Sequence, residues 1–308
     1  MASGEKVPVV AILTYRDGTR IFRGNRDNFI ELLRTAKEEG VNAYIVAHDD
    51  LNLRAGALKG YVYHPARKKW SYGSRPFPDV VYNRIPYRKF EQLPEVQALI
   101  NECLSHPSIR FFNPSFFSKW SLFEWLSESR LTRAHIPETV RLAGLADFTR
   151  LVRRHRQVYL KPVKGKAGRG IMKVQRLTPK RGGASGGGYR LTWQSGDGVE
   201  STVHETISSM YDAVKKYMDG KEYIAQQGIS LAHAGGRPFD LRVLVQKNAR
   251  GEWRVSGIGA RVAGASSITT HVPRGGTIGD PGKLLANVFG KTSGAAILRK
   301  AREIAILL

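Results

Sequence analysis

The chain has 308 residues, of which 42% are hydrophobic and 9% aromatic, so it is too large for a small peptide module and too apolar for a disordered protein. Its 49 Lys and Arg residues against 26 Asp and Glu give a formal net charge of +23, which favours binding to anions. One cysteine cannot form an internal disulfide, and no window approaches the roughly 18 uninterrupted apolar residues that a membrane helix needs. We therefore expect a globular protein of the cytoplasm, built as two domains or as one large composite.

The N-terminal part alternates between short apolar runs and one amphipathic segment. Residues 7–14 and 41–47 read as buried strands, and the apolar spacing of residues 26–39 between them predicts a helix. Strand, helix and strand in about forty residues indicate a right-handed βαβ unit at the start of a parallel sheet. Residues 79–83 form a plausible third strand.

An aromatic segment follows. Ser121 and Glu124 have the spacing of a capping box, which predicts the start of a helix. Trp120, Phe123 and Trp125 could form a stacking platform, but aromatic residues at helical spacing are far more often core. We interpret these three side chains as core.

The segment around residues 159–174 has the pattern of a phosphate-binding hairpin. An apolar strand carries Lys161, glycines stand at 165, 168 and 170, and a second strand follows through residues 171–174. Glycines allow backbone N–H groups to turn toward an anion, and nearby ammonium groups neutralise its charge. A flexible basic hairpin is the alternative, and the two flanking strands favour the phosphate site. A Walker motif and a dinucleotide-binding fingerprint are both absent.

The remaining elements alternate between helices and strands. Residues 178–188 are a glycine-rich insert, residues 207–218 predict an amphipathic helix, and residues 223–225 a strand. Residues 240–246 and 252–256 alternate in polarity about a turn and predict an antiparallel hairpin. The last predicted helix covers residues 295–308.

The positive charge is concentrated in one stretch. Residues 148–196 contain thirteen Lys or Arg residues and no carboxylate. A solvated basic surface explains part of this excess, and a nearby nucleotide, polyanion or acidic substrate is the alternative.

Taken together, these motifs resemble the ATP-grasp superfamily, and most closely its spore-coat-associated YheC/YheD-type family. The resemblance rests on residues 112–114 with 119–120, 161–171, 226–229, 239–247, 259–264 and 267–276. It implies an α/β, Rossmann-like domain over residues 1–114 and an α+β ATP-grasp domain over 115–308. In that domain, lobes of residues 115–220 and 221–308 clamp ATP between them.

The resemblance also implies roles for individual residues. Lys161 corresponds to the lysine at the α- and β-phosphates, the glycine loop to a lid, and residues 226–229 to the hinge beside adenine. Asp240 corresponds to a residue near the ribose, and Arg242 to one that holds phosphates. The implied nucleotide-binding residues are Lys161, Gly165, Lys166, Gly168, Gly170, Gln226, Gln227, Gly228, Ile229, Asp240, Thr269, Thr270 and His271, and the implied catalytic residues are Arg242 and Arg274.

Three of these assignments have alternatives or departures. Asp240 and Arg242 could form an exposed ion pair along one strand. His271 replaces an Asn common among relatives, and its role could instead be merely to cap its loop. Gln227 stands where relatives often carry Glu.

The implied reaction is a ligation in which ATP phosphorylates a substrate carboxylate and an amine or thiol then attacks the acyl-phosphate. The family requires Mg²⁺, but no Glu-x-Asn follows Gly276, where only Asp280 and Glu303 are acidic. The sequence therefore predicts a C-terminally truncated enzyme without metal ligands.

Other functions remain open. The expected partners are ATP, an unidentified carboxylate such as an acidic peptide, and components of the spore coat. A non-catalytic nucleotide-binding or coat-assembly protein is the alternative, and nucleic-acid binding through the basic stretch ranks last.

Overall fold

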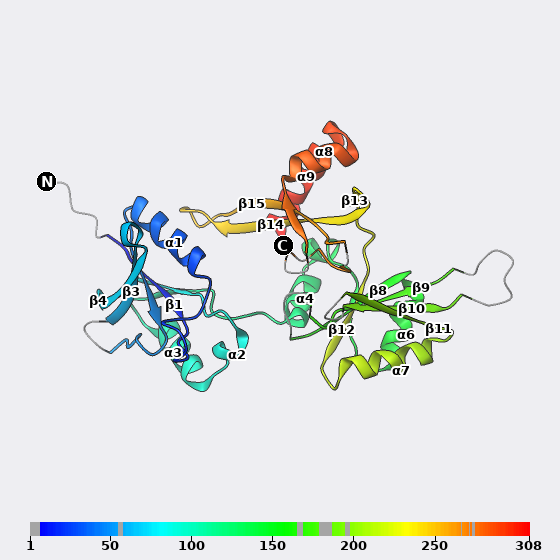
Figure 1. Cartoon of the computed structure of the whole chain (residues 1–308), viewed down its shortest axis with the longest axis horizontal. Helices are drawn as coiled ribbons and strands as arrows, with labels where there is room; N and C mark the ends of the chain where they lie inside the picture. The colour runs from blue at the N-terminus through cyan, green and yellow to red at the C-terminus, as the bar shows by residue number, and fades with distance from the viewer. Residues whose placement is uncertain are drawn as a thin grey trace. The chain divides into compact units, whose positions relative to one another are not determined.

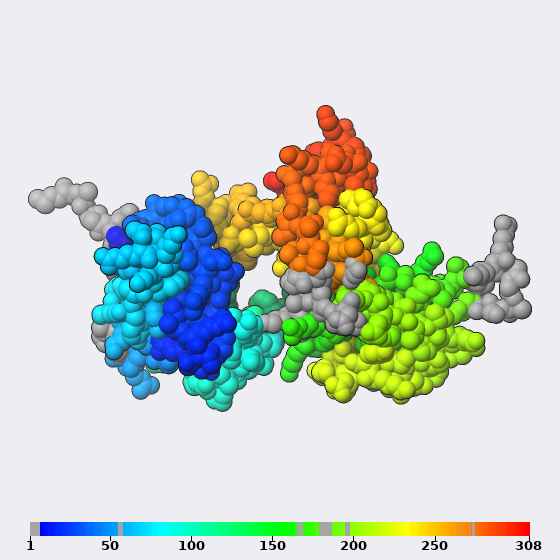
Figure 2. Space-filling model, viewed as in Figure 1, coloured from blue at the N-terminus to red at the C-terminus, as the bar shows by residue number. Residues whose placement is uncertain are grey.

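A computed structural model describes residues 7–54, 58–164, 169–178, 187–194, 198–265, 267–270, 272 and 275–308. The chain divides into two compact units, Met1–Phe116 and Phe117–Leu308. Figure 1 traces the elements of each unit, and Figure 2 shows the same chain as spheres.

The first unit is built on a six-stranded sheet of order β4-β3-β2-β1-β5-β6. Its strands are β1 (Val9–Thr14), β2 (Asn42–Ala47), β3 (Leu58–His64), β4 (Lys69–Arg75), β5 (Val80–Asn83) and β6 (Arg110–Phe112). β2, β1, β5 and β6 run parallel, whereas β3 and β4 are added antiparallel at one edge. The predicted parallel strands are therefore confirmed.

Helices cover both faces of this sheet. The helical elements of the first unit are α1 (Arg26–Glu38), the 3-10 turn η1 (Pro65–Arg67), α2 (Arg88–Glu91) and α3 (Pro94–Ser105). Phe29 of α1 packs with Ile12 and Ile45 on one face, and α3 contributes to the core on the other face. Burial on both sides explains why β1 and β2 are almost continuously apolar. The Rossmann-like description of this unit remains a prediction.

The first sheet of the second unit is antiparallel and has the strand order β11-β10-β9-β8-β12-β7. Its strands are β7 (Thr139–Arg141), β8 (Gln157–Pro162), β9 (Met172–Arg176), β10 (Tyr189–Gln194), β11 (Val199–His204) and β12 (Tyr223–Gln227). The helices α6 (Leu145–Arg154) and α7 (Ile207–Met218) pack on one face over a core that includes Leu160, Met172 and Leu191. We call the opposite face of this sheet the open face.

A second sheet of order β13-β14-β15-β16 completes the unit. Its elements are β13 (His233–Ala234), β14 (Arg237–Lys247), β15 (Trp253–Val262), β16 (Thr277–Gly279), α8 (Pro281–Phe289) and α9 (Lys291–Leu307). Phe239, Val262 and Leu285 form its small core with the helices. The antiparallel pairing of β14 with β15 confirms the predicted hairpin.

The prediction for the aromatic segment was wrong in two respects. The helix α4 (Lys119–Glu128) begins two residues before Ser121, and it is Ser118 whose Oγ accepts the backbone N–H of Ser121 at 2.9 Å. No residue of α4 is buried, and Trp125 is 53% exposed. Helical spacing shows that side chains share a face, but it does not show that another element covers that face.

Two further expectations concern the glycine-rich insert and the membrane. Most of the insert, residues 179–186, lies outside the described residues. Within the described ranges, none of the helices combines the length and the hydrophobicity that crossing a membrane requires.

Candidate functional site

The candidate site is centred on Lys161, which β8 places on the open face. Strand alternation directs Leu160 into the core under α6 and α7, so its neighbour Lys161 points the other way. The Lys161 Nζ donates a hydrogen bond to Gln226 Oε1 at 2.5 Å and lies 5.8 Å from the centre of the Tyr159 ring. Burial, and then the charge of Lys119, lower the pKa of Lys161 below its usual value.

Lys119 is a second cation beside this group, and the sequence analysis gave it no role. It is the first residue of α4, and its Nζ donates to the carbonyl oxygen of Pro162 at 2.9 Å. Pro162, the strand residue after Lys161, therefore holds Lys119 beside Lys161, although the two lysines lie far apart in the sequence. The motif of residues 119–120 was the signal that could have identified it.

Behind Lys161, a chain of polar contacts continues into β7. Gln226 Nε2 donates to Thr139 Oγ1 at 2.9 Å, and the Thr139 hydroxyl donates to the Pro137 carbonyl at 3.0 Å. Thr139 is only 5% exposed. The sequence analysis missed Thr139, because nothing in its local pattern relates it to Lys161.

The predicted hinge, residues 226–229, lies mostly inside the sheet. The backbone N–H of Gln227 donates to Glu138 at 2.8 Å, and that of Gly228 donates to Gln157 at 2.8 Å. No described residue accepts the N–H of Ile229, whose side chain is 56% exposed. A base edge could therefore be read by the backbone N–H of Ile229, but not by those of Gln227 and Gly228.

Side chains fix this hinge from the β7 side. Gln227 Oε1 accepts the backbone N–H of Glu138 at 3.1 Å, and the Glu138 carboxylate contacts His155 at 2.7 Å and Arg154 at 2.5 Å. Partial burial opposes ionisation of Glu138, but His155 and Arg154 outweigh it and lower the pKa of the carboxyl. A Cβ at Gly228 would lie 2.4 Å from Gln157 Cγ, so only glycine fits there without rearrangement.

The glycine loop joins β8 to β9, which pair antiparallel as predicted. Gly170 has a φ of +70°, and its carbonyl accepts the Tyr223 hydroxyl at 2.9 Å. A Cβ at Gly170 would lie 3.0 Å from both Pro162 and Tyr223, so conformation and space both favour glycine. The predicted loop residues Gly165, Lys166 and Gly168 lie outside the described residues.

The alternative pairing of Asp240 with Arg242 does not form. Asp240 on β14 faces Arg261 on β15, which donates from Nε to Oδ1 at 2.8 Å and from Nη2 to Oδ2 at 2.7 Å. Thr270 Oγ1 also donates to Asp240 Oδ2, at 2.7 Å. Arg242 is exposed and makes no recorded hydrogen bond or ion pair with the described part of the chain.

The remaining predicted residues belong to the loop after β15. The Ser267 hydroxyl accepts the backbone N–H of Thr269 at 3.1 Å and donates to its carbonyl at 2.8 Å. The Tyr159 hydroxyl donates to the Ile268 carbonyl at 3.4 Å, so this loop contacts the open face beside Lys161. His271 and Arg274 lie outside the described residues.

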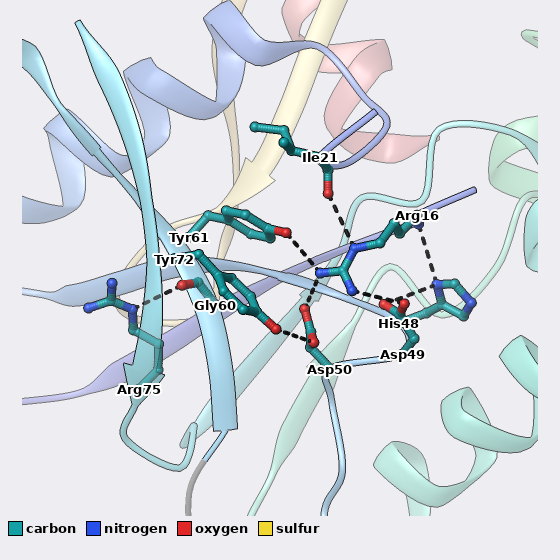
Figure 3. A network of polar contacts seen from close by, with 9 residues as sticks. All are labelled: Arg16, Ile21, His48, Asp49, Asp50, Gly60, Tyr61, Tyr72 and Arg75. Carbon is teal, nitrogen blue, oxygen red and sulfur yellow. Dashed lines mark hydrogen bonds and ion pairs between the residues drawn. The ribbon is translucent and has the colours of Figure 1, made fainter. Parts of the chain in front are cut away.

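A second polar cluster, in the first unit, was not predicted (Figure 3). Arg16 follows β1, and its guanidinium contacts Asp49 at 2.9 Å, Asp50, and the Tyr61 hydroxyl at 2.9 Å. Burial lowers the pKa of Arg16, but hydrogen bonding and the charges of Asp50 and Asp49 outweigh it, so the pKa is raised. The Arg16 Nε also donates to the Ile21 carbonyl. This guanidinium therefore joins the ends of β1 and β2 and has little hydrogen-bonding capacity left for an anion.

Within the described ranges, no group of three or more His, Cys, Asp or Glu side chains could hold a metal ion. The acidic residue nearest the predicted reaction end, Asp240, already accepts three hydrogen bonds. The Asp240 carboxylate is therefore largely occupied by contacts within the described part of the chain, and the absence of metal ligands remains a prediction.

Comparison with solved structures finds a synthetase and a ligase at low similarity. D-cycloserine synthetase DcsG is 13% identical with a TM-score of 0.43 over 94% of this chain and 82% of that chain. The ATP-grasp ligase PsnB, complexed with minimal precursor, Mg and ADP, is 12% identical with a TM-score of 0.43 over 95% of this chain and 81% of that chain.

Sequence comparison finds two relatives in Bacillus subtilis (strain 168). Endospore coat-associated protein YheD is 27% identical over 286 residues, which are 92% of this chain and 60% of YheD. Endospore coat-associated protein YheC is 23% identical over 235 residues, which are 76% of this chain and 62% of YheC. This chain thus spans about three fifths of the length of either relative. Because the family model described as YheC/D like ATP-grasp matches residues 108–308, more than half of the chain, the protein belongs to the YheC/D-like ATP-grasp family.

Proposed function

We propose that this protein binds ATP on the open face and uses it to activate a carboxylate. The observation that carries the proposal is the placement of Lys161: a half-buried lysine, beside the second cation Lys119 and held by a neutral amide. No described carboxylate forms an ion pair with Lys161, so its charge remains available to a phosphate. Charge-assisted contacts of this kind offset the cost of desolvating phosphate oxygens.

The hinge supports adenine at one end of this site. Ile229 offers a backbone N–H to a purine ring nitrogen, while β12 carries Gln226 toward Lys161. Asp240 remains our choice for the ribose hydroxyls, since its Oδ1 accepts one hydrogen bond, from Arg261, and has a second lone pair. The exposed guanidinium of Arg242 suits the phosphates, and Thr269, His271 and Arg274 are proposed for the reaction end.

The proposed reaction has two steps. A substrate carboxylate oxygen attacks the γ-phosphorus of ATP, and ADP leaves. An amine or thiol then attacks the carbonyl carbon of the acyl-phosphate, loses its proton, and phosphate departs. Cationic side chains assist both steps, because negative charge gathers on the transferred group and on the leaving phosphate.

The substrate and the setting are proposed from charge and from the relatives. A chain with a net charge of +23 suits an acidic substrate, such as a peptide rich in carboxylates. YheD and YheC are named endospore coat-associated proteins, and we propose the same association for this chain.

Replacing Lys161 tests the nucleotide site. Lys161→Ala should weaken binding of a non-hydrolysable ATP analogue at least about tenfold, because a charge-assisted phosphate contact is lost. The matched control is Lys216→Ala, an exposed lysine of α7 on the covered side of the same sheet. Isothermal titration calorimetry that gave equal affinities for wild type and Lys161→Ala would contradict the proposal.

Turnover is tested separately. With Mg²⁺ supplied in the assay, ADP release should depend on one member of a panel of amino acids and acidic peptides. Tight ATP binding with no substrate-dependent ADP release would reject the ligase reaction and support a non-catalytic, nucleotide-binding role in the coat.

A further inference from the structure

The contacts behind Lys161 form a continuous line across three strands. Register pairs Thr139 of β7 with Gln226 of β12, and Gln226 with Tyr159 of β8. Lys161 lies two residues beyond Tyr159 and therefore on the same face of the strand. Its Nζ can then reach Gln226 Oε1, at 2.5 Å.

The chemistry of the end groups determines the orientation of the amide between them. An ammonium group only donates, so Lys161 requires the oxygen of Gln226 and not its nitrogen. The Thr139 hydroxyl has one proton, which it gives to the Pro137 carbonyl at 3.0 Å. Its lone pairs can then only accept, and they accept from Gln226 Nε2 at 2.9 Å.

The Lys161 ammonium and the Thr139 hydroxyl thus each select the same orientation of the Gln226 carboxamide. A reversed amide would direct Nε2–H₂ at the Lys161 ammonium, and its oxygen could accept from Thr139 only if the hydroxyl gave up its bond to the Pro137 carbonyl. Thr139 is 5% exposed, so water does not readily replace its hydroxyl.

We propose that Thr139 is a positioning residue for Lys161: its hydroxyl fixes the orientation of the Gln226 carboxamide, whose oxygen then holds the Lys161 ammonium at the nucleotide site. The consequence for ATP rests on the proposed function. The effect on Lys161 itself does not, because it requires no nucleotide.

The environment of Lys161 makes this effect measurable. Among the described residues, the charged and titratable groups that act on it are Lys119 from α4, which opposes its charge, and Tyr159 on its own strand. In the described part of the chain, Gln226 Oε1 accepts the hydrogen bond of the Lys161 ammonium. Weakening that acceptor should therefore favour the neutral amine.

The experiment replaces the Thr139 hydroxyl by a methyl group of similar size. In Thr139→Val, the titration midpoint of Lys161 in the nucleotide-free protein should fall by roughly half a pH unit or more. The midpoint is measured from the pH dependence of Lys161 acylation by mass spectrometry. Affinity for the ATP analogue should fall roughly three- to tenfold.

Two variants separate positioning from a general effect on the fold. Thr139→Ser keeps the hydroxyl and should restore both the midpoint and the affinity. Thr192→Val removes another buried hydroxyl from the same sheet, on β10, and should change neither.

A double-mutant cycle gives the decisive outcome. Gln226→Leu should shift the Lys161 midpoint in the same direction, and Thr139→Val should add nothing to it, because the two residues act through one amide. An unchanged midpoint in Thr139→Val, no rescue by serine, or additive shifts in the double variant would each overturn the proposal. A shifted midpoint, with ATP affinity indifferent even to Lys161→Ala, would keep Thr139 as a positioning residue and reject the nucleotide site instead.

Discussion

At the residue scale, the two polar clusters of this protein differ in how much hydrogen-bonding capacity their cations have left for a ligand. Arg16 donates to carboxylates, a tyrosine hydroxyl and a backbone carbonyl, so its hydrogen-bonding capacity is largely spent within the first unit. Lys161 donates to one neutral amide and has no described carboxylate partner. A saturated guanidinium stabilises a fold, whereas a partly buried ammonium without a counter-charge suits a ligand that supplies the negative charge.

Removing Arg16 should therefore destabilise the first unit. Arg16→Met leaves Asp50, whose side chain is 11% exposed, without its main partner, and we expect a loss of about 2–4 kcal/mol. The free energy of opening is measured by hydrogen exchange at the backbone amides of β1 and β2. Arg34→Met, which breaks exposed pairs with Glu31 and Glu38, should cost less than about 1 kcal/mol. Equal protection in wild type and Arg16→Met would show that this cluster does not join the strands.

Glu138 predicts a specific dependence on pH. Its pKa is lowered in the folded protein, so its contribution to stability is present above the pKa of the unfolded chain, about 4.5, and is lost as the pH falls through the folded value. Glu138→Gln should lower the thermal midpoint at pH ~7, and the difference from wild type should shrink below pH ~4. Thermal unfolding followed by circular dichroism at both pH values checks this, and a difference that grew in acid would contradict it.

At the element scale, two aromatic helices have opposite relations to the core. Phe148 of α6 is completely buried beneath the first sheet of the second unit, while Trp125 of α4 is 53% exposed. Both helices carry apolar side chains at helical spacing, so the sequence pattern alone does not distinguish them. Among the described residues, α6 contributes side chains to the core of this sheet, whereas α4 has no buried residue.

The difference predicts unequal costs of truncation. Phe148→Ala should reduce the free energy of unfolding by about 3–5 kcal/mol, because it leaves a cavity in a packed core. Trp125→Ala should cost less than about 1 kcal/mol, as exposed positions usually do. Urea unfolding followed by far-ultraviolet circular dichroism compares the two. A cost for Trp125→Ala as large as that for Phe148→Ala would mean that α4 packs more tightly than its exposure indicates.

At the scale of the whole molecule, charge gives a test between two classes of ligand. The +23 charge should produce some binding to any polyanion, with an affinity that falls steeply as salt rises. Excess ATP should not displace a nucleic acid that binds non-specifically to the basic surface. ATP bound at Lys161 should lose affinity far less between about 50 and 200 mM salt, since base and sugar contacts do not release counterions. Filter binding over this range checks both expectations. Parallel salt dependence of the two ligands would place ATP among the non-specific anions.

Local elements could be predicted from the amino-acid sequence alone. α1, α7 and the β14–β15 hairpin follow from apolar periodicity and turn residues, and the family follows from motifs that are each contiguous. The sequence also predicted site roles for Lys161 and Gln226, because each stands within such a motif, and these roles remain predictions.

Only the tertiary structure decided which of these residues meet. Thr139, Lys161 and Gln226 come together because β7, β12 and β8 are neighbours in one sheet, and Asp240 meets Arg261 rather than Arg242 because the hairpin register pairs them. The exposure of α4 was decided in the same way. Periodicity records which side chains share a face of one element, whereas the partner of that face depends on contacts between segments that lie far apart in the chain.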